Sequence, residues 1–279
     1  MLTIRIFTYE NEYGKSIIFN DDLPRFLKSM SAPVGKTSIT SGAIGQDGIS
    51  TLLETLNQRN IVCEFVYQFN CSAQEYRQGW IDICSILNPK LKGTITYTSD
   101  AGSWQIDVSP LETPLLENQH FSVTFVADYP YWRKTESIVH RFGTVEGGLT
   151  FPFCFDSYVT FGEWTNKFSY INDSGVDTPF EIVIESVGDY CQIINEKGEF
   201  IKVNKPLAAG QKLKINTFTN DVILVDTDGT ETYANNYVVI DSNLEMILHN
   251  GENVLTFDNG LATLPIAKIT INQLYVEVK

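Results

Sequence analysis

The chain has 279 residues, of which 43% are hydrophobic and 19% charged, so it can bury real cores and intrinsic disorder is excluded. At about 150 residues per domain, this length predicts two domains. Thirty-four acidic against 20 basic residues give a net charge of −14, which argues against binding to phosphate backbones or anionic lipid surfaces. No apolar run approaches the ~18 residues of a membrane-spanning helix, and the first residues read as a strand rather than an export leader. We therefore expect a soluble chain that does not insert into membranes.

Most of the chain reads as strands. Apolar and polar residues alternate with a period of two, which places one face of each strand in a core and the other in solvent. This pattern predicts an all-β fold of antiparallel sheets packed as sandwiches. It is clearest in residues 62–69, 94–98, 104–108, 121–126 and 180–184.

Two segments suggest helices. Residues 50–57 are a weakly marked candidate. Residues 72–88 are better marked, because Ser72 and Glu75 form a capping box and Asn88-Pro89 ends the segment. Tyr76, Trp80, Ile83 and Leu87 draw an apolar stripe along one side of this segment. The sequence therefore predicts an amphipathic helix lying flat against a sheet.

Turn residues separate the strands. Asp228-Gly229 and Asn250-Gly251 suit hairpin turns of type I′, in which both central residues have positive φ. A stretch rich in glycine and aromatic residues begins at Arg133 and leads to the strands of the second half. We place the division near residue 140, which gives domains 1–140 and 141–279.

The sequence carries no recognisable catalytic or metal-binding motif. The histidines are isolated from one another, and the five cysteines include no C-x-x-C pair. One segment partly matches a nucleotide-binding loop and another partly matches a calcium-binding loop, but neither has a glycine at the position that the loop requires. We therefore expect no catalytic residues, no metal and no cofactor. The odd number of cysteines, most of them among apolar neighbours, favours buried thiols and a reducing compartment.

Two alternatives concern glycans. Exposed aromatic side chains can stack on sugar rings, so Trp164 and Tyr170 are candidate glycan contacts of a carbohydrate-binding module. Asp156 and Glu163 are the carboxylate pair that a glycan-cleaving enzyme would use. The same residues can be explained without any ligand, if the acids are solvated residues of surface loops and the aromatic side chains are part of the core.

Several short segments form a pattern along the chain. The most distinctive is Phe121–Trp132, a strand that runs into an aspartate, a proline and an aromatic cluster. The others are Gly45–Gly48, Leu53–Leu56, Arg59–Ile61, Leu87–Pro89, Gly93–Tyr97, Gly148–Pro152, Asn172–Gly175 and Gly251–Phe257. Taken in this order, these segments resemble the distal tail protein family of long-tailed (siphovirus-type) phages.

The resemblance implies a structural protein of the baseplate at the virion tail tip, made in the cytoplasm of the bacterial host. In that family the first domain is a β-sandwich with a belt-like extension, and six copies join in a homo-hexameric ring. The second domain is a galectin-like sandwich. The ring joins the tail tube protein to the tail-associated hub or lysin protein and lets DNA pass. Receptor-binding and tape-measure proteins are further candidate partners, and sequence-specific binding of nucleic acid is not expected.

If the chain is such a ring subunit, its residues of interest lie at interfaces. The candidates are Arg59, Arg77 on the helix, and the corner formed by Asp128, Tyr129, Tyr131 and Trp132. Two purely structural roles remain open: Trp132 pins the junction between the domains, or Arg59 pairs with a surface acid.

Overall fold

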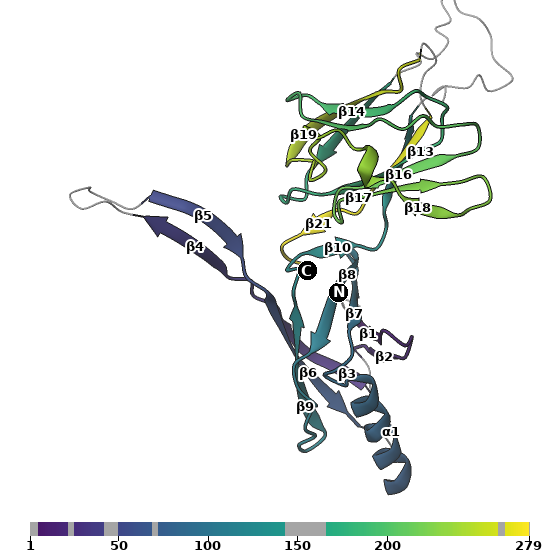
Figure 1. Ribbon diagram of the computed structural model, residues 1–279. Helices are drawn as coiled ribbons and strands as arrows, with labels where there is room; N and C mark the ends of the chain where they lie inside the picture. Colours follow the sequence, from purple (N-terminus) through teal and green to yellow (C-terminus); the bar gives the residue numbers. More distant parts are fainter. Residues whose placement is uncertain are drawn as a thin grey trace, which may run out of the picture. The chain divides into compact units, whose positions relative to one another are not determined.

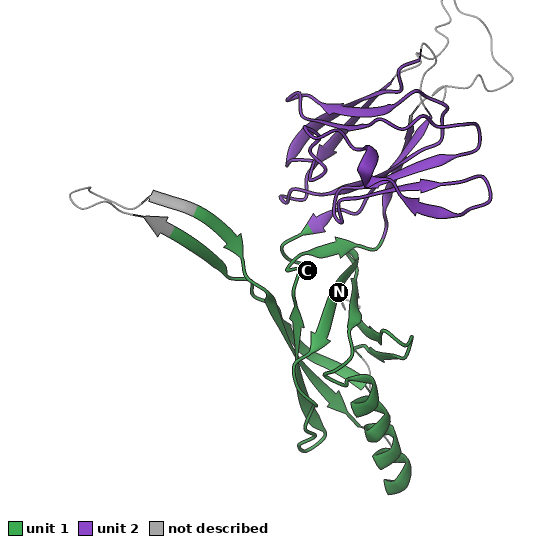
Figure 2. Cartoon of the chain, in the orientation of Figure 1, with its two compact units in different colours: residues 1–135, 275–279 green, residues 136–274 purple. Residues whose placement is uncertain are grey.

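The computed structural model describes residues 5–21, 25–41, 50–68, 72–142, 166–261 and 266–278. The chain divides into two compact units, which Figure 2 shows in different colours. The first unit comprises residues 1–135 together with 275–279, and the second comprises residues 136–274. The division predicted from the sequence lies near residue 140, with the whole C-terminal segment in the second domain. The last five residues instead belong to the first unit, where Tyr275 and Val278 pack against its core.

The first unit is built on one continuous antiparallel sheet with the strand order β2-β1-β7-β8-β9-β6-β3 (Figure 1). Strand β8 links two layers, because it pairs with β7 over most of its length and with β9 only at Ser109 and Pro110. The end strands β2 and β3 meet at a bridge between Asn20 and Phe26, so the sheet wraps around its core. Its strands are β1 (Ile6–Asn11), β2 (Ser16–Phe19), β3 (Arg25–Ser31), β6 (Arg59–Tyr67), β7 (Gly93–Ser99), β8 (Gly102–Pro110), β9 (His120–Ala127) and β10 (Trp132–Lys134), with β10 paired to β8.

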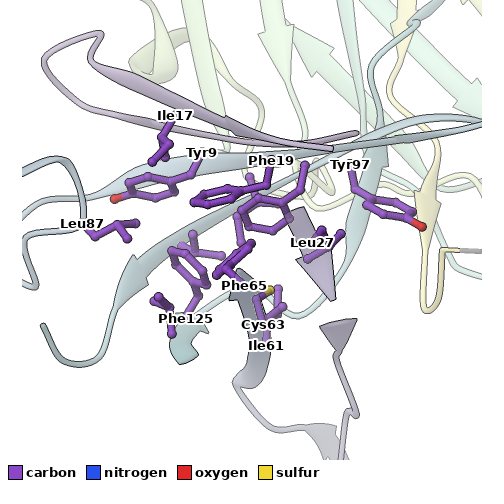
Figure 3. Packing of buried hydrophobic residues seen from close by; sticks show 14 of the residues in the cluster. Tyr9, Ile17, Phe19, Leu27, Ile61, Cys63, Phe65, Leu87, Tyr97 and Phe125 are labelled. Atoms are coloured by element: carbon purple, nitrogen blue, oxygen red, sulfur yellow. The ribbon is translucent and has the colours of Figure 1, made fainter. Parts of the chain in front are cut away.

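Aromatic rings dominate this first core. Phe7 and Phe19 from β1 and β2 meet Phe65 from β6, with ring centroids 5.3 Å and 4.0 Å from that of Phe65. Phe121 and Phe125 from β9 complete the cluster. Figure 3 labels Phe19, Phe65 and Phe125 among the buried residues around them. All five side chains are buried. The alternation that predicted the strands thus places every second residue of β1, β6 and β9 in one shared interior.

Helix α1 (Ala73–Ile86) confirms the helix expected between residues 72 and 88. Both bonds of the capping box are present: Ser72 Oγ accepts from the Glu75 amide, and the Glu75 carboxylate accepts from the Ser72 amide. These bonds hold the pKa of Glu75 below its ordinary value. The apolar stripe of the helix packs on the first core, with Ile83 and Leu87 buried and Tyr76 and Trp80 half-buried.

The first unit carries a two-stranded hairpin that we call the arm (Figure 1). It consists of β4 (Lys36–Ser41) and β5 (Ser50–Leu56). Among the residues that the structure describes, these strands pair with each other and with no other strand. The helix expected over residues 50–57 is therefore wrong. The leucines of this segment are as compatible with a strand as with a helix. The pairing with β4 decides between them, and a short window of sequence does not contain that information.

The second unit is a sandwich of two antiparallel sheets. One has the order β11-β20-β13-β16-β17-β18 and the other β12-β19-β14-β15. Their facing sides bury a second apolar core, which includes Phe180, Ile193, Leu213 and Ile269. The strands are β11 (Ile138–Phe142), β12 (Lys167–Asn172), β13 (Phe180–Ile184), β14 (Cys191–Asn195), β15 (Phe200–Val203), β16 (Lys212–Asn216), β17 (Asp221–Val225), β18 (Glu231–Tyr233), β19 (Gly251–Asp258) and β20 (Ala267–Ile271), with a 3₁₀ turn at Asn235–Tyr237 and β21 (Leu274–Tyr275) where the chain returns to the first unit.

Neither predicted type I′ turn forms. Gly229 and Gly251 have positive φ, but Asp228 and Asn250 do not. Gly229 donates its amide to the Asp226 carbonyl inside a longer loop, and Gly251 begins β19. Among the described residues, a turn with positive φ at both central positions occurs at Asn118 and Gln119. The flanking residues Glu117 and His120 exchange two backbone hydrogen bonds. No glycine marks that turn in the sequence.

Candidate interaction surfaces

Within the described ranges, no group of three or more His, Cys, Asp and Glu side chains could hold a metal ion. Cys63, Cys84 and Cys191 are free thiols, and burial raises the pKa of each. No helix in the described part of the chain has the length and apolar character needed to cross a bilayer. The candidate functional sites among the described residues are therefore interaction surfaces. The arm is the first of these surfaces.

The two faces of the arm differ in charge. Ile39 lies opposite Leu53, and Thr37 lies opposite Thr55, so these four uncharged side chains share one face. On the other face the Lys36 ammonium lies 3.0 Å from a Glu54 carboxylate oxygen. Ile39 is 54% exposed and Leu53 is 53% exposed. The arm therefore presents an apolar and threonine face to its surroundings, with its charges paired on the opposite side.

A groove lies at the base of the arm, and we call it the Arg59 groove. Its walls are residues 30–34, which comprise the end of β3 and the start of the connector into the arm, and residues 276–278 of the C-terminal segment. Arg59 and Trp132 also line it. Arg59 and Trp132 were separate candidates in the sequence, and the structure brings them together here. The two wall segments have no signal in the sequence, because no local pattern links residue 30 to residue 276.

Arg59 holds the C-terminal segment. Its side chain is 1% exposed, and a terminal guanidinium nitrogen donates to the Val276 carbonyl oxygen. Burial lowers the pKa of this guanidinium, and the nearby Glu277 carboxylate and Tyr131 act in the opposite direction. Among the described residues no carboxylate lies within 4.0 Å of the Arg59 guanidinium, although the Glu277 carboxylate is close enough to raise its pKa, so the pairing of Arg59 with a surface acid stays a prediction.

The corner formed by residues 128–132 is partly buried and partly exposed to solvent. Trp132 is fully buried in the first core, whereas Asp128 is exposed and Tyr129 is 38% exposed. The rings of Tyr129 and Tyr131 meet edge to face at 5.2 Å. Desolvation, with a smaller effect of Tyr131, raises the pKa of Tyr129 to about 12, so its hydroxyl stays protonated at neutral pH. The corner thus combines a buried indole with a pair of tyrosine rings and one exposed carboxylate.

The remaining candidates are scattered. Arg77 is exposed on α1, on the side away from the core. Tyr170 is half-buried, and its ring stacks on Phe168 with a centroid distance of 6.0 Å, so it is part of the second unit's packing. Trp164, Asp156 and Glu163 lie outside the described residues, and with them the candidate carboxylate pair.

The molecule is thus an all-β protein of two units, the first of which carries a two-stranded arm. Two family models match the chain: phage tail protein RIFT-related domain over residues 14–127, and siphovirus-type tail component, C-terminal domain, over residues 173–271. Together they span most of both units. The chain belongs to the siphovirus-type phage tail component family, as a distal tail or baseplate component.

Solved structures share the fold. The Dit protein of phage SPP1, described as a paradigm of the hub adsorption apparatus of phages that infect Gram-positive bacteria, matches with a TM-score of 0.65 and 11% identity, over 95% of this chain and 98% of that one. A chain of the phage P2 baseplate in its activated conformation with Ca matches with a TM-score of 0.53 and 15% identity over the full length of both chains. A search of curated proteins finds no match.

Proposed function

We propose that six copies of this chain form a closed ring at the tail tip, which joins the tail tube protein to the tail-associated hub or lysin protein and leaves an axial passage for DNA. The chain itself is a structural component of the siphovirus-type tail, and the families it matches are structural tail proteins. In this proposal it catalyses no reaction. It is made in the host cytoplasm and is then built into the virion, with receptor-binding and tape-measure proteins as further neighbours.

The arm is the main observation that supports the proposed ring. An isolated two-stranded hairpin is at best marginally stable in water, because it has no core to pack against. The described part of the arm pairs with no other strand of its own chain and exposes Ile39 and Leu53. Docking this face on a different patch of the next copy removes it from water. Repeated around an axis, such a head-to-tail contact closes a ring.

The distribution of charge supports the same arrangement. The first unit has 15 acidic and 12 basic residues, whereas the second has 19 acidic and 8 basic residues. Copies that meet through nearly neutral first units experience little mutual repulsion. The strongly acidic second unit then suits a position away from the subunit contacts, where screening over about 8 Å reduces repulsion between neighbours. Acidic groups at the bore would in turn keep DNA from adhering to the wall.

Native mass spectrometry and negative-stain electron microscopy of the purified chain test the proposal. We expect a closed ring with six times the monomer mass of 31.4 kDa. Leu53→Ser removes an exposed apolar group from the arm, and we expect it to shift the chain toward monomers. Phe218→Ser, at a residue of the second unit that is 56% exposed, is the matched control and should leave the ring intact. A wild-type chain that stays monomeric at high concentration would overturn the ring.

A further inference from the structure

The chain contains two Asn-Gly pairs, and they lie in different environments. Asn250 precedes Gly251 at the start of β19, and Asn259 precedes Gly260 just after the end of that strand. A glycine has no Cβ, so its amide nitrogen is little shielded and its backbone rotates freely. In the sequence, both asparagines are therefore open to attack by the amide nitrogen of the next residue. The structure distinguishes between them.

Asn250 has the freedom that this attack requires. Its side chain is exposed, and a Cβ placed on Gly251 would meet no atom within 4 Å. Gly251 forms the last residue pair of β12 and β19, opposite Asn172, and pairs at the end of a ladder open most readily. Among the described residues, the side-chain amide of Asn250 forms one hydrogen bond, in which Oδ1 accepts from the Gly175 amide at 3.2 Å. Its Nδ2, which is the leaving group in such a reaction, has no hydrogen-bond partner in that part of the chain.

Asn259 is held in place by comparison. It is 1% exposed, and its Nδ2 donates to the Val187 carbonyl oxygen at 3.1 Å. Like Asn250, it accepts one backbone N–H at Oδ1. The Gly260 amide nitrogen, which would be the attacking atom, donates to Asp258 Oδ1 at 3.0 Å. A Cβ on Gly260 would lie 2.7 Å from the Tyr190 ring, so the backbone has little room to rotate. Attack at Asn259 therefore requires local unfolding.

We propose that Asn250 is a site of spontaneous deamidation in the folded chain, and that Asn259 is protected. The Gly251 amide nitrogen bonds to Cγ of Asn250 while the Cγ–Nδ2 bond breaks, and the amide proton leaves with Nδ2 as ammonia. Water then adds to one of the two carbonyl carbons of the cyclic imide and breaks its bond to nitrogen, which gives aspartate or isoaspartate. The reaction consumes one water and releases one ammonia, and nothing is oxidised or reduced. This inference does not rest on the proposed ring.

The products change the surface around Asn250. The Asn250 backbone N–H donates to Asp177 Oδ1 at 3.1 Å, and His249 Nδ1 lies 3.1 Å from Asp177 Oδ2. Both products place a new carboxylate near that of Asp177, and like charges repel. Isoaspartate also adds one carbon to the main chain directly before β19, where its ladder with β12 ends. A tail subunit is not replaced after assembly, so we expect these changes to accumulate with the age of the virion.

Peptide mapping by mass spectrometry tests this site. The purified chain is incubated in its folded state, which circular dichroism verifies, and in parallel in denaturing urea until both Asn-Gly pairs of the unfolded chain have reacted. In the folded chain we expect Asn250 to deamidate at least about 10-fold faster than Asn259, because Asn259 reacts only when its surroundings open. In urea the two rates should be similar. Asn60, which is exposed but precedes an isoleucine, is the control for exposure alone and should not react measurably over the same time.

Isoelectric focusing of the incubated folded chain gives a second readout. Deamidation adds one negative charge, so the wild type should develop an acidic band that Asn250→Gln lacks. An unreacted Asn250 in the folded chain, when both pairs have reacted in urea, would overturn the inference. Equal rates at Asn250 and Asn259 in the folded chain would also overturn it, because the structure would then give no protection. An acidic band that persists in Asn250→Gln would assign the change of charge to another residue and refute the site.

Discussion

Replacing Phe65 tests whether ring packing holds the first unit together. Its ring contacts those of Phe7, Phe19 and Phe121, with centroid distances of 5.3, 4.0 and 5.1 Å, and the side chain is fully buried. Phe65→Ala should lower the free energy of unfolding by about 3–5 kcal/mol, because it removes the ring and leaves a cavity. Phe65→Leu fills most of that space and should cost about 2 kcal/mol, since each aromatic pair is worth about 0.5–1.5 kcal/mol and neighbouring pairs do not add fully.

Urea unfolding followed by tryptophan fluorescence measures these changes at a fixed protein concentration. Three of the four tryptophans belong to the first unit, and the ring centroid of one of them, Trp80, lies 5.0 Å from that of Phe121. The signal therefore reports on the unit that contains Phe65. Phe218→Ala in the second unit is the control and should change this transition by less than about 0.5 kcal/mol. If Phe65→Leu costs no more than that control, the ring contacts do not stabilise the unit in the way argued here.

Two further predictions concern polar groups of the first unit. Ser72→Ala should lower the free energy of unfolding by about 1 kcal/mol through loss of the helix cap, as measured by urea unfolding, and an equal loss in the exposed Ser16→Ala would show that the cap has no special role. The Arg133 guanidinium, which donates to Asp107 Oδ1 at 2.6 Å, holds the pKa of Asp107 below its ordinary value, against the opposing effect of desolvation. A carboxyl group with a lowered folded-state pKa stabilises the fold above its unfolded pKa of about 4 and loses that contribution as the pH falls through the folded value. Asp107→Asn should thus be less stable than the wild type at pH 7, and the difference should shrink as the pH falls below the unfolded pKa and vanish below the lowered folded pKa. A difference that stays constant as the pH falls would contradict the assignment.

The sequence predicted the elements whose signals are local. Alternation placed β6, β7, β8, β9 and β13 within a few residues of their bounds. The capping box of Ser72 and Glu75 marked the start of α1, because both of its bonds lie within one turn. These elements are determined by interactions between residues close in the sequence, so a short segment of sequence is enough to predict them.

The sequence did not predict features that depend on distant partners. Residues 50–56 form a strand because β4 pairs with them, and Arg59 is buried because it binds a carbonyl 217 residues further along the chain. For the same reason the sequence could name Arg59 and Trp132 but could not show that they share one groove. The interface roles of Arg77, Asp128, Tyr129 and Tyr131 stay predictions.

The return of residues 275–279 to the first unit makes the second unit an insertion within the first. The ribosome must therefore synthesise all of residues 136–274 before the segment that Arg59 holds exists. One wall of the groove at the base of the arm is absent until then. The order of synthesis thus delays completion of this surface, and the first unit of a nascent chain is not finished before the second unit has been made.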